Sequence, residues 1–314
     1  MLVVAGTTTL VYGIIEEPGD GWTDSRVLAG LVGGGVLLVL FAAQELRTRS
    51  PLVDLRLFLN RRFTWATIAF VVAGFALTGL MFILTPYLQV VQGNDAQGTG
   101  VRLLPMIAAL IVAAAASARL VARLGTKVMV SGGLLVTSAG LVILSRVGAE
   151  SGYGLVAAGL AVIGLGIGFA MPTALDAVLG ALPPTHTGVG TGLSRSLQQV
   201  GASFGVAILG SILNSAYRSG LDGNLAGLPA QVRGAVQGSV AGAAAAAQHL
   251  PGPLAVPLVH AAHAAYANGM AEVLLVCTGL MVVGALLVAL FLPSRAPAAG
   301  GRAEASVAPQ GAVV

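Results

Sequence analysis

The sequence predicts an all-α protein that crosses a lipid bilayer about eight times. Hydrophobic residues make up 56% of its 314 residues and charged residues only 9%, whereas a soluble domain carries about 25% charged residues. The mean hydropathy is +0.90, and apolar runs near the ~20 residues that span a membrane recur along the chain. The 44 glycines suit helices that pack closely in lipid. Because so few charges cannot cover a water-exposed surface, we expect a bundle of membrane helices.

The composition and motifs also argue against several kinds of functional site. Cys277 is the only cysteine, so neither an intrachain disulfide nor a cluster of thiolate ligands can form. His260 and His263 have no third ligand nearby, which argues against a zinc site. The net charge is only +4 and most basic residues lie in short loops, which argues against nucleic-acid binding. Because no phosphate-binding loop, HExxH motif or Ser–His–Asp order occurs, we expect neither an enzyme nor a bound cofactor.

Eight apolar stretches are candidate membrane spans. They comprise residues 1–16, 27–44, 63–91, 101–120, 128–144, 153–182, 187–213 and 270–292. A long segment, 214–269, separates the last two, and its Ala-rich stretches 230–249 and 253–268 are predicted helices. Because these stretches carry Arg, Gln and His residues, we expect them outside the membrane or on its surface. A ninth span within the segment is the alternative.

Basic residues are distributed unevenly between the two sides of the predicted membrane. Ten lie in the loops after the second and fourth spans and in the C-terminal tail, and five lie in the loops on the other side. The remaining one, Arg195, lies within a span. Because loops rich in Lys and Arg stay in the cytoplasm, we expect a multi-pass protein of the cell membrane with both termini in the cytoplasm.

The seventh span carries the most informative polar pattern. Its polar and small residues recur at steps of three and four, so they share one broad helical face. These residues are Gly188, Thr191, Arg195, Gln198, Gln199 and Ser203. A charge within a span is costly and faces a bundle interior or a watery cavity, so we interpret this face as the wall of a transport path. The alternative is that Arg195 extends to the nearby interface while the two glutamines join helices.

Two acidic residues are further candidates. Asp176 lies about two turns from the end of the sixth span, and a short turn with two prolines connects that span to the helix of Arg195. Asp176 is expected to pair with Arg195, to take part in proton coupling, or to be exposed at the interface. Glu272 lies near the outer end of the last span, where it is either an interfacial acid or a residue that attracts cations to the mouth. Tyr87 is predicted to be an interface anchor.

Small residues mark positions where helices are expected to pack closely or to flex. Gly164 and Gly168 are four residues apart in the sixth span, and Gly201 and Gly205 repeat this spacing in the seventh. Pro172 follows the first pair and is expected to kink its helix.

Four stretches carry a resemblance to a known family. They are LVYGIIEEPGDGW, FAAQELRTRSPLVDLRLFLNRRF, PYLQVVQGNDAQGTGVRLLP and PPTHTGVGTGLSRSLQQVGASFGVAILGSI. In their order and spacing they resemble the fourteen-helix drug:proton antiporters of the major facilitator superfamily (EmrB/QacA type). The resemblance implies two linker helices with a basic loop (1–62), the C-terminal six-helix half (63–293) and a disordered cytoplasmic tail (294–314).

The resemblance also implies a function and partners. Such proteins export hydrophobic or amphipathic compounds, often cationic, in exchange for protons, and their substrate cavity lies between two six-helix halves. The N-terminal half has no counterpart in this sequence, and the first span is short. We therefore expect an N-terminally incomplete copy of a transporter. The alternatives are a truncated, non-transporting membrane protein and a chain that needs a separate six-helix partner.

A cytoplasmic loop motif of the family is partly present in ARLVARLGTK. Arg123, Gly125 and Lys127 stand where the family has Arg, Gly and a basic residue. Ala118 and Ala122 replace the first Gly and the Asp of the motif, so the charge pair that the full motif implies cannot be transferred to Ala122. The alternative is a plain basic loop.

Overall fold

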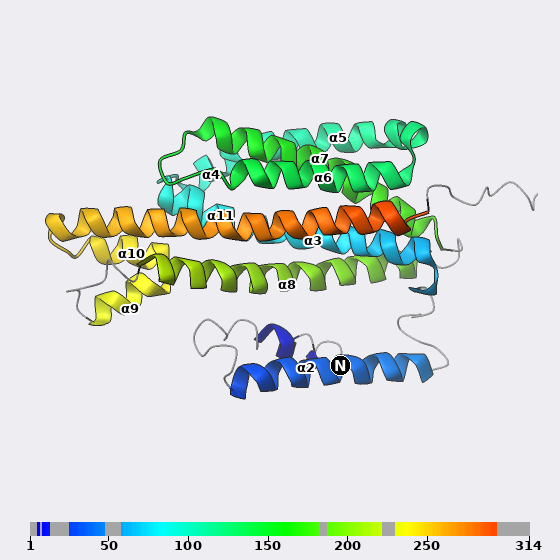
Figure 1. The fold of residues 1–314 in the computed structure, drawn as a ribbon, viewed down its shortest axis with the longest axis horizontal. Coiled ribbons are helices and arrows are strands. Elements are labelled where there is room, and N and C mark those ends of the chain that lie inside the picture. Colours follow the sequence, from blue (N-terminus) through cyan, green and yellow to red (C-terminus); the bar gives the residue numbers. More distant parts are fainter. Residues whose placement is uncertain are drawn as a thin grey trace, which may run out of the picture.

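The computed structural model describes residues 5–6, 8–12, 25–47, 58–182, 187–221 and 230–293, and within them the chain is almost entirely helical, with no strand. The helices run nearly parallel or antiparallel to one another in an elongated bundle (Figure 1). They are α2 (Ser25–Arg47), α3 (Arg61–Pro86), α4 (Ala96–Arg102), α5 (Leu104–Leu124), α6 (Thr126–Leu144), α7 (Tyr153–Leu179), α8 (Thr187–Leu221), α9 (Ala230–Gly238), α10 (Val240–Ala247) and α11 (Gly252–Phe291). A π-helical turn, η2 (Tyr87–Val91), extends α3.

Six stretches in the described part of the chain are long and apolar enough to cross a membrane, and they confirm the six predicted spans of the bundle. They are Arg61–Val91, Ala96–Leu124, Thr126–Leu144, Tyr153–Leu179, Gly190–Leu221 and Gly252–Phe291. The predicted span 27–44 lies within α2, of which the stretch Leu28–Leu37 is a shorter apolar helix and not among the six. Most of the predicted span 1–16 and the whole predicted tail 294–314 lie outside the described residues. The chain is therefore an all-α, multi-pass membrane protein.

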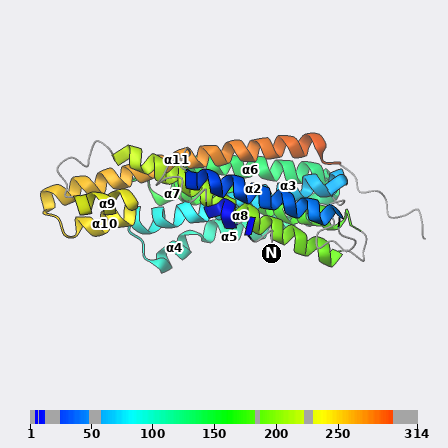
Figure 2. The same cartoon turned by 90° about the horizontal axis from the view of Figure 1, so that it is seen from below.

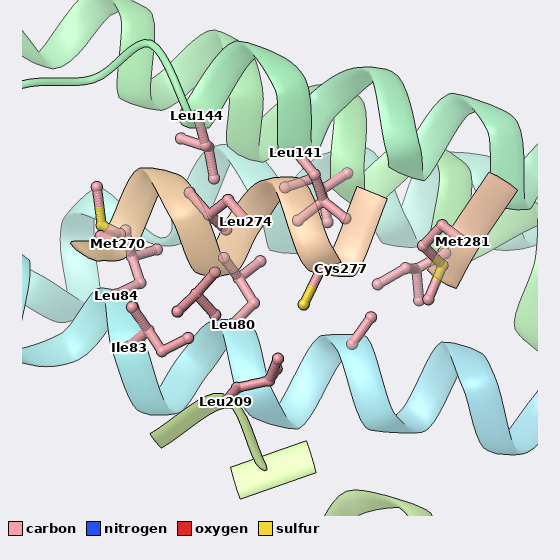
Figure 3. Close-up of a cluster of buried hydrophobic side chains, with 14 of the residues drawn as sticks. Leu80, Ile83, Leu84, Leu141, Leu144, Leu209, Met270, Leu274, Cys277 and Met281 are labelled. Carbon is pink, nitrogen blue, oxygen red and sulfur yellow. The ribbon is translucent and has the colours of Figure 1, made fainter. Parts of the chain in front are cut away.

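The six spans form two interlocked groups. Helices α5 and α6 pack against α7, whereas α8 and α11 pack against α3; contacts of α3 with α7 and of α6 with α11 join the groups. Figure 3 shows this junction, where Leu80, Leu141, Leu209 and Cys277 meet from four helices. All four side chains are fully or almost fully buried. The apolar residues on the inner faces thus form one continuous core along the bundle.

Helices α8 and α11 are much longer than predicted. They contain 35 and 40 residues, which correspond to about 52 Å and 60 Å of helix, whereas the hydrocarbon core of a bilayer is about 30 Å thick. The predicted helices 253–268 and 270–292 are one continuous helix, because Asn268 and Gly269 do not interrupt α11. Both helices therefore project beyond the other spans at one end of the bundle (Figure 1).

The projecting ends carry a small helical cap, made of α9 and α10. The predicted Ala-rich helix 230–249 forms these two helices, and neither is a candidate span. The Tyr217 hydroxyl donates a hydrogen bond to the Val236 carbonyl (3.1 Å) and so fixes α9 to α8. The Tyr266 hydroxyl donates to the Ile83 carbonyl (2.8 Å) and fixes α11 to the end of α3. We call this end of the bundle the cap end, and the other end the basic end, because Arg61, Arg62 and the α5–α6 turn lie there.

Helix α2 lies outside the six-helix bundle, alongside α8 in both views (Figures 1 and 2). The short helical segment 8–12 lies between them. An added Cβ atom at Gly34 of α2 would come within 2.6 Å of the Leu10 side chain. Val11 lines a cavity together with residues of α3 and α8. The predicted linker region thus contacts the bundle on the side of α8.

Candidate transport site

A cavity of about 240 Å³ lies where α3, α5, α7 and α8 meet. Phe70 of α3, Leu110 of α5, and Gly168 and Pro172 of α7 form apolar walls. Arg195 of α8 is the only charged one among the described residues that line it. The cavity is thus an apolar space with one fixed positive charge.

Two partners within reach hold the Arg195 guanidinium. Its Nη1 donates a hydrogen bond to Oε1 of Gln198 (3.1 Å), which is three residues further along the same helix. Its Cζ lies 5.6 Å from the centroid of the Phe70 ring, a distance at which the negative ring face attracts a cation. The side chain itself is exposed. The guanidinium therefore borders the cavity, and within the described residues Gln198 is the one side chain that accepts a hydrogen bond from it.

The other polar residues of the predicted face divide between two places. Gln198 packs against α3 at Gly74, where an added Cβ would lie 2.7 Å from the Gln198 Cγ. Gln199 and Ser203 line a second cavity, of about 300 Å³, together with Thr78 of α3 and Val11. The predicted polar face is therefore not one continuous path wall, because the segment of Val11 lies over its second part. Thr191 is half-buried in the first turns of α8.

The predicted ion pair between Asp176 and Arg195 is not formed. Asp176 is exposed near the end of α7, and within the described ranges no hydrogen bond or ion pair connects it to Arg195. The expectation was that two helices joined by a short turn are packed together. Instead α8 packs mainly against α3 and α11, and its contact with α7 is slight.

Glycines allow α5 and α7 to approach closely at the cavity. An added Cβ at Gly168 would lie 2.6 Å from the Leu110 carbonyl oxygen, and one at Gly164 would collide with the Met106 carbonyl oxygen. Pro172 lies inside α7 and lacks an N–H, so the Gly168 carbonyl has no helical donor four residues later. The wall of the cavity is therefore a place where the regular bonding of α7 is interrupted.

The second pair of glycines brings α8 close to α3. An added Cβ at Gly201 would lie 2.6 Å from Cγ1 of Val71, and one at Gly205 would lie 2.7 Å from the Phe75 carbonyl oxygen. These contacts hold the helix of Arg195 at a short distance from the helix of Phe70.

The residues of the loop motif lie in the tight turn between α5 and α6. Gly125 has a φ of +83°, which residues with a side chain rarely adopt. Arg123 is exposed and Lys127 half-exposed, so both charges point away from the core. The turn explains why a glycine stands at this position of the motif.

A polar cluster at the cap end was missed from the sequence. We call it the Gln92 cluster: Nε2 of Gln92 donates to the Tyr87 hydroxyl (3.0 Å) and to the Ser151 carbonyl (3.1 Å), and its Oε1 accepts a hydrogen bond from Arg102 (2.5 Å). The Tyr153 hydroxyl donates to the Arg102 carbonyl (3.0 Å), and the Arg102 guanidinium lies over the Tyr153 ring. Tyr87 is fully buried, so the prediction that it anchors the protein at the interface was wrong.

The comparisons with known proteins agree with this architecture. Residues 1–206 match the family model of the Major Facilitator Superfamily. The tetracenomycin C resistance and export protein of Streptomyces glaucescens is 34% identical over 194 residues, which are 62% of this chain and 36% of that protein. The multidrug resistance protein Stp of Mycobacterium tuberculosis is 29% identical over 203 residues, 65% of this chain and 38% of that protein.

A third relative, the methylenomycin A resistance protein of Streptomyces coelicolor, is 28% identical over 202 residues, 64% of this chain and 42% of that protein. The matched region thus spans about two fifths of the length of these relatives. Since the family match extends over 206 residues, and six packed apolar helices can cross a membrane, the chain belongs to the major facilitator superfamily, whose members are transporters and not enzymes.

Proposed function

We propose that the chain is the C-terminal half of a proton-coupled exporter of hydrophobic or amphipathic compounds. The observation that carries the proposal is the cavity of Arg195: apolar walls from three helices, α3, α5 and α7, and one oriented cation from α8. Apolar walls with few polar groups accept many ligands of similar size and polarity. The printed names of the relatives, which refer to multidrug resistance and to antibiotic export, support the same class of substrate.

Arg195 binds the polar part of a substrate in this proposal. Its position over Phe70 keeps the positive charge at the edge of the apolar space. There it donates hydrogen bonds to polar or anionic groups of a substrate, while the apolar walls contact the remainder.

A companion six-helix half completes the site in our proposal. The cavity volume of about 240 Å³ is below the roughly 300–1,000 Å³ of typical ligand pockets. The span of α4 and α5 has only 17% of its apolar window buried, whereas the other five candidate spans have 39–56%. The exposed side of α5 and the exposed Arg195 border the same cavity. A second half that covers them would enlarge the cavity and exclude lipid from the arginine.

Asp176 is the candidate for proton coupling on this chain, and the basic end is proposed to face the cytoplasm. Asp176 is exposed near that end of α7, where a carboxylate can exchange protons with water. Arg61, Arg62, Arg123 and Lys127 are at the same end, as the positive-inside rule requires of a cytoplasmic side. The proposed location is the cell membrane, with the cap on the outside.

The test is efflux of norfloxacin, a fluorescent amphipathic compound that carries a carboxylate group, from cells with an imposed pH gradient. The chain would be expressed alone and together with the N-terminal half of the tetracenomycin relative. We expect efflux only from the pair, and its loss on collapse of the gradient. Efflux by the chain alone would refute the need for a companion half, and efflux that survives without the gradient would refute proton coupling.

Variants of the pair assign the residues. Arg195→Ala is expected to lower efflux at least tenfold, while Arg146→Ala, which removes an exposed arginine at the cap end, is the matched control and is expected to leave it unchanged. Asp176→Asn tests coupling: if efflux and its dependence on pH are both unchanged, Asp176 has no role in coupling.

A further inference from the structure

A cavity far from Arg195 lies in a groove between α8 and α11 at the cap end. Its volume is about 700 Å³. Ser215 and Ser219 of α8 line one side, and Asn268 and Glu272 of α11 line the other. The family match ends at residue 206, so this groove belongs to a part of the chain that the match does not cover.

The groove lies at the level of one membrane surface. Phe291 at the basic end of α11 stacks on Trp65, with ring centroids 4.8 Å apart, and aromatic residues of this kind gather at membrane interfaces. A rise of about 1.5 Å per residue places Glu272 about 29 Å from Phe291, which matches the hydrocarbon thickness of about 30 Å. Glu272 is therefore at the opposite interface, at the height of the lipid headgroups.

The face of α11 that carries Glu272 is a lipid-facing face. Below Glu272, toward the basic end, the same face continues with large exposed apolar side chains. They are Leu275, Val276, Val283, Leu286 and Leu290. A phospholipid carries a polar headgroup above apolar acyl chains. Along α11 the exposed carboxylate of Glu272 lies above the exposed apolar residues in the same order, so each part of a lipid would meet a matching part of this face.

The opposite wall has the same order of polarity. Ile208 and Ile212 of α8 line the groove nearer the bilayer, and Ser215 and Ser219 follow one and two turns further out. Hydroxyl groups and the Asn268 amide can donate hydrogen bonds to phosphate oxygens, whereas a carboxylate such as that of Glu272 can only accept them. Within the described part of the chain Glu272 forms no ion pair or hydrogen bond, so its acceptor positions are available.

We propose that this groove binds a phospholipid with a primary amine headgroup, such as phosphatidylethanolamine. The ammonium group donates hydrogen bonds to Glu272, the phosphate accepts from Asn268 and the serine hydroxyls, and an acyl chain follows the apolar stripe of α11. Anionic phosphatidylglycerol is disfavoured because Glu272 repels it. Phosphatidylcholine is disfavoured because its quaternary ammonium has no N–H to donate.

The test is competition among lipids for the purified full chain, read by native mass spectrometry. An equimolar mixture of phosphatidylethanolamine, phosphatidylcholine and phosphatidylglycerol with identical acyl chains is added in detergent. We expect retained phosphatidylethanolamine to exceed each of the others about three- to fivefold, the ratio for an interfacial ion pair of up to ~1 kcal/mol. Equal retention of the three lipids would overturn the proposal.

Substitutions of the exposed acid distinguish the groove from general lipid adhesion. Glu272→Gln is expected to bring the three lipids to parity, and Glu272→Lys to favour phosphatidylglycerol. Glu150→Gln changes another exposed acid, in the turn between α6 and α7 at the same end, and is expected to keep the preference. A preference that survives Glu272→Gln, or one that Glu150→Gln also abolishes, would refute the assignment.

A last arm separates a lipid from a free amine. Glycerophosphoethanolamine carries the same headgroup without acyl chains, and at equal concentration it is expected not to displace the lipid. Displacement would show that the groove binds the headgroup chemistry alone and would overturn the assignment to a lipid. None of these measurements depends on transport.

Discussion

Replacing Gln92 by leucine should weaken the cap end of the bundle measurably. Gln92 is half-buried and forms three hydrogen bonds that connect the end of α3, the end of α4 and the turn before α7. A net hydrogen bond between neutral groups stabilises a fold by roughly 1 kcal/mol, and one with a charged partner by about 1.5–3 kcal/mol. Two bonds are neutral and the third comes from Arg102, so we expect Gln92→Leu to lower the free energy of unfolding by about 3.5–5 kcal/mol.

The assay is equilibrium unfolding of the purified chain by SDS, followed by circular dichroism. The matched control is Gln248→Leu at the exposed end of α10, which should change the free energy of unfolding by less than ~0.5 kcal/mol. The double variant Gln92→Leu/Arg102→Met should lose less free energy of unfolding than the sum of the losses of the two single variants. The difference, the coupling energy, should be about 1 kcal/mol. A Gln92→Leu protein as stable as the control would show that water replaces these bonds and would refute the reasoning.

Three further substitutions and one matched control can be measured by the same unfolding assay. Gly164→Ala should cost about 1–3 kcal/mol, because its Cβ collides with a backbone carbonyl of α5, whereas Gly192→Ala, with no atom within reach of the new Cβ, should be neutral or stabilising by up to ~1 kcal/mol. Gly125→Ala should cost about 1 kcal/mol because its φ is positive; an unchanged midpoint would mean that the turn relaxes. Tyr266→Phe should cost about 1 kcal/mol because it removes the bond to the Ile83 carbonyl, and a smaller loss than for Gly192→Ala would contradict this role.

The six long spans could be predicted because apolar length is a local property of the sequence. The ends of α8 and α11 could not. The residues that extend α11 are Ala-rich and continue a helix equally well in water, whereas the polar residues that extend α8 are held by tertiary contacts such as the Tyr217 bond to α9. Hydropathy marks where a chain leaves lipid, but not where its helix ends. For this reason the separate predicted helix 253–268 turned out to be the projecting part of α11.

The candidate site was predicted only in part, and for a different reason. Arg195 could be recognised because a charge in a span is costly wherever it points. Gln198 could be placed beside it because it lies three residues further along the same helix. The walls of the cavity could not be predicted, because they lie on α3, α5 and α7 and the sequence holds no direct sign of which helices meet. Phe70 looked like any core aromatic, and Asp176 was favoured only because it is near in sequence.

The cavity of Arg195 and the groove between α8 and α11 should respond independently to substitution. Arg195 and Ser215 lie on one helix but about 30 Å apart, and the first site lies within the family match whereas the second lies beyond it. A change at Glu272 should therefore alter which lipid the chain retains and leave the range of exported compounds unaltered, and a change at Arg195 should do the reverse. The unfolding midpoint of the chain can be compared between vesicles of phosphatidylethanolamine and vesicles of phosphatidylcholine. Glu272→Gln should remove any difference between the two midpoints, whereas Arg195→Ala should preserve it. If both variants removed that difference, the two cavities would be energetically coupled along α8.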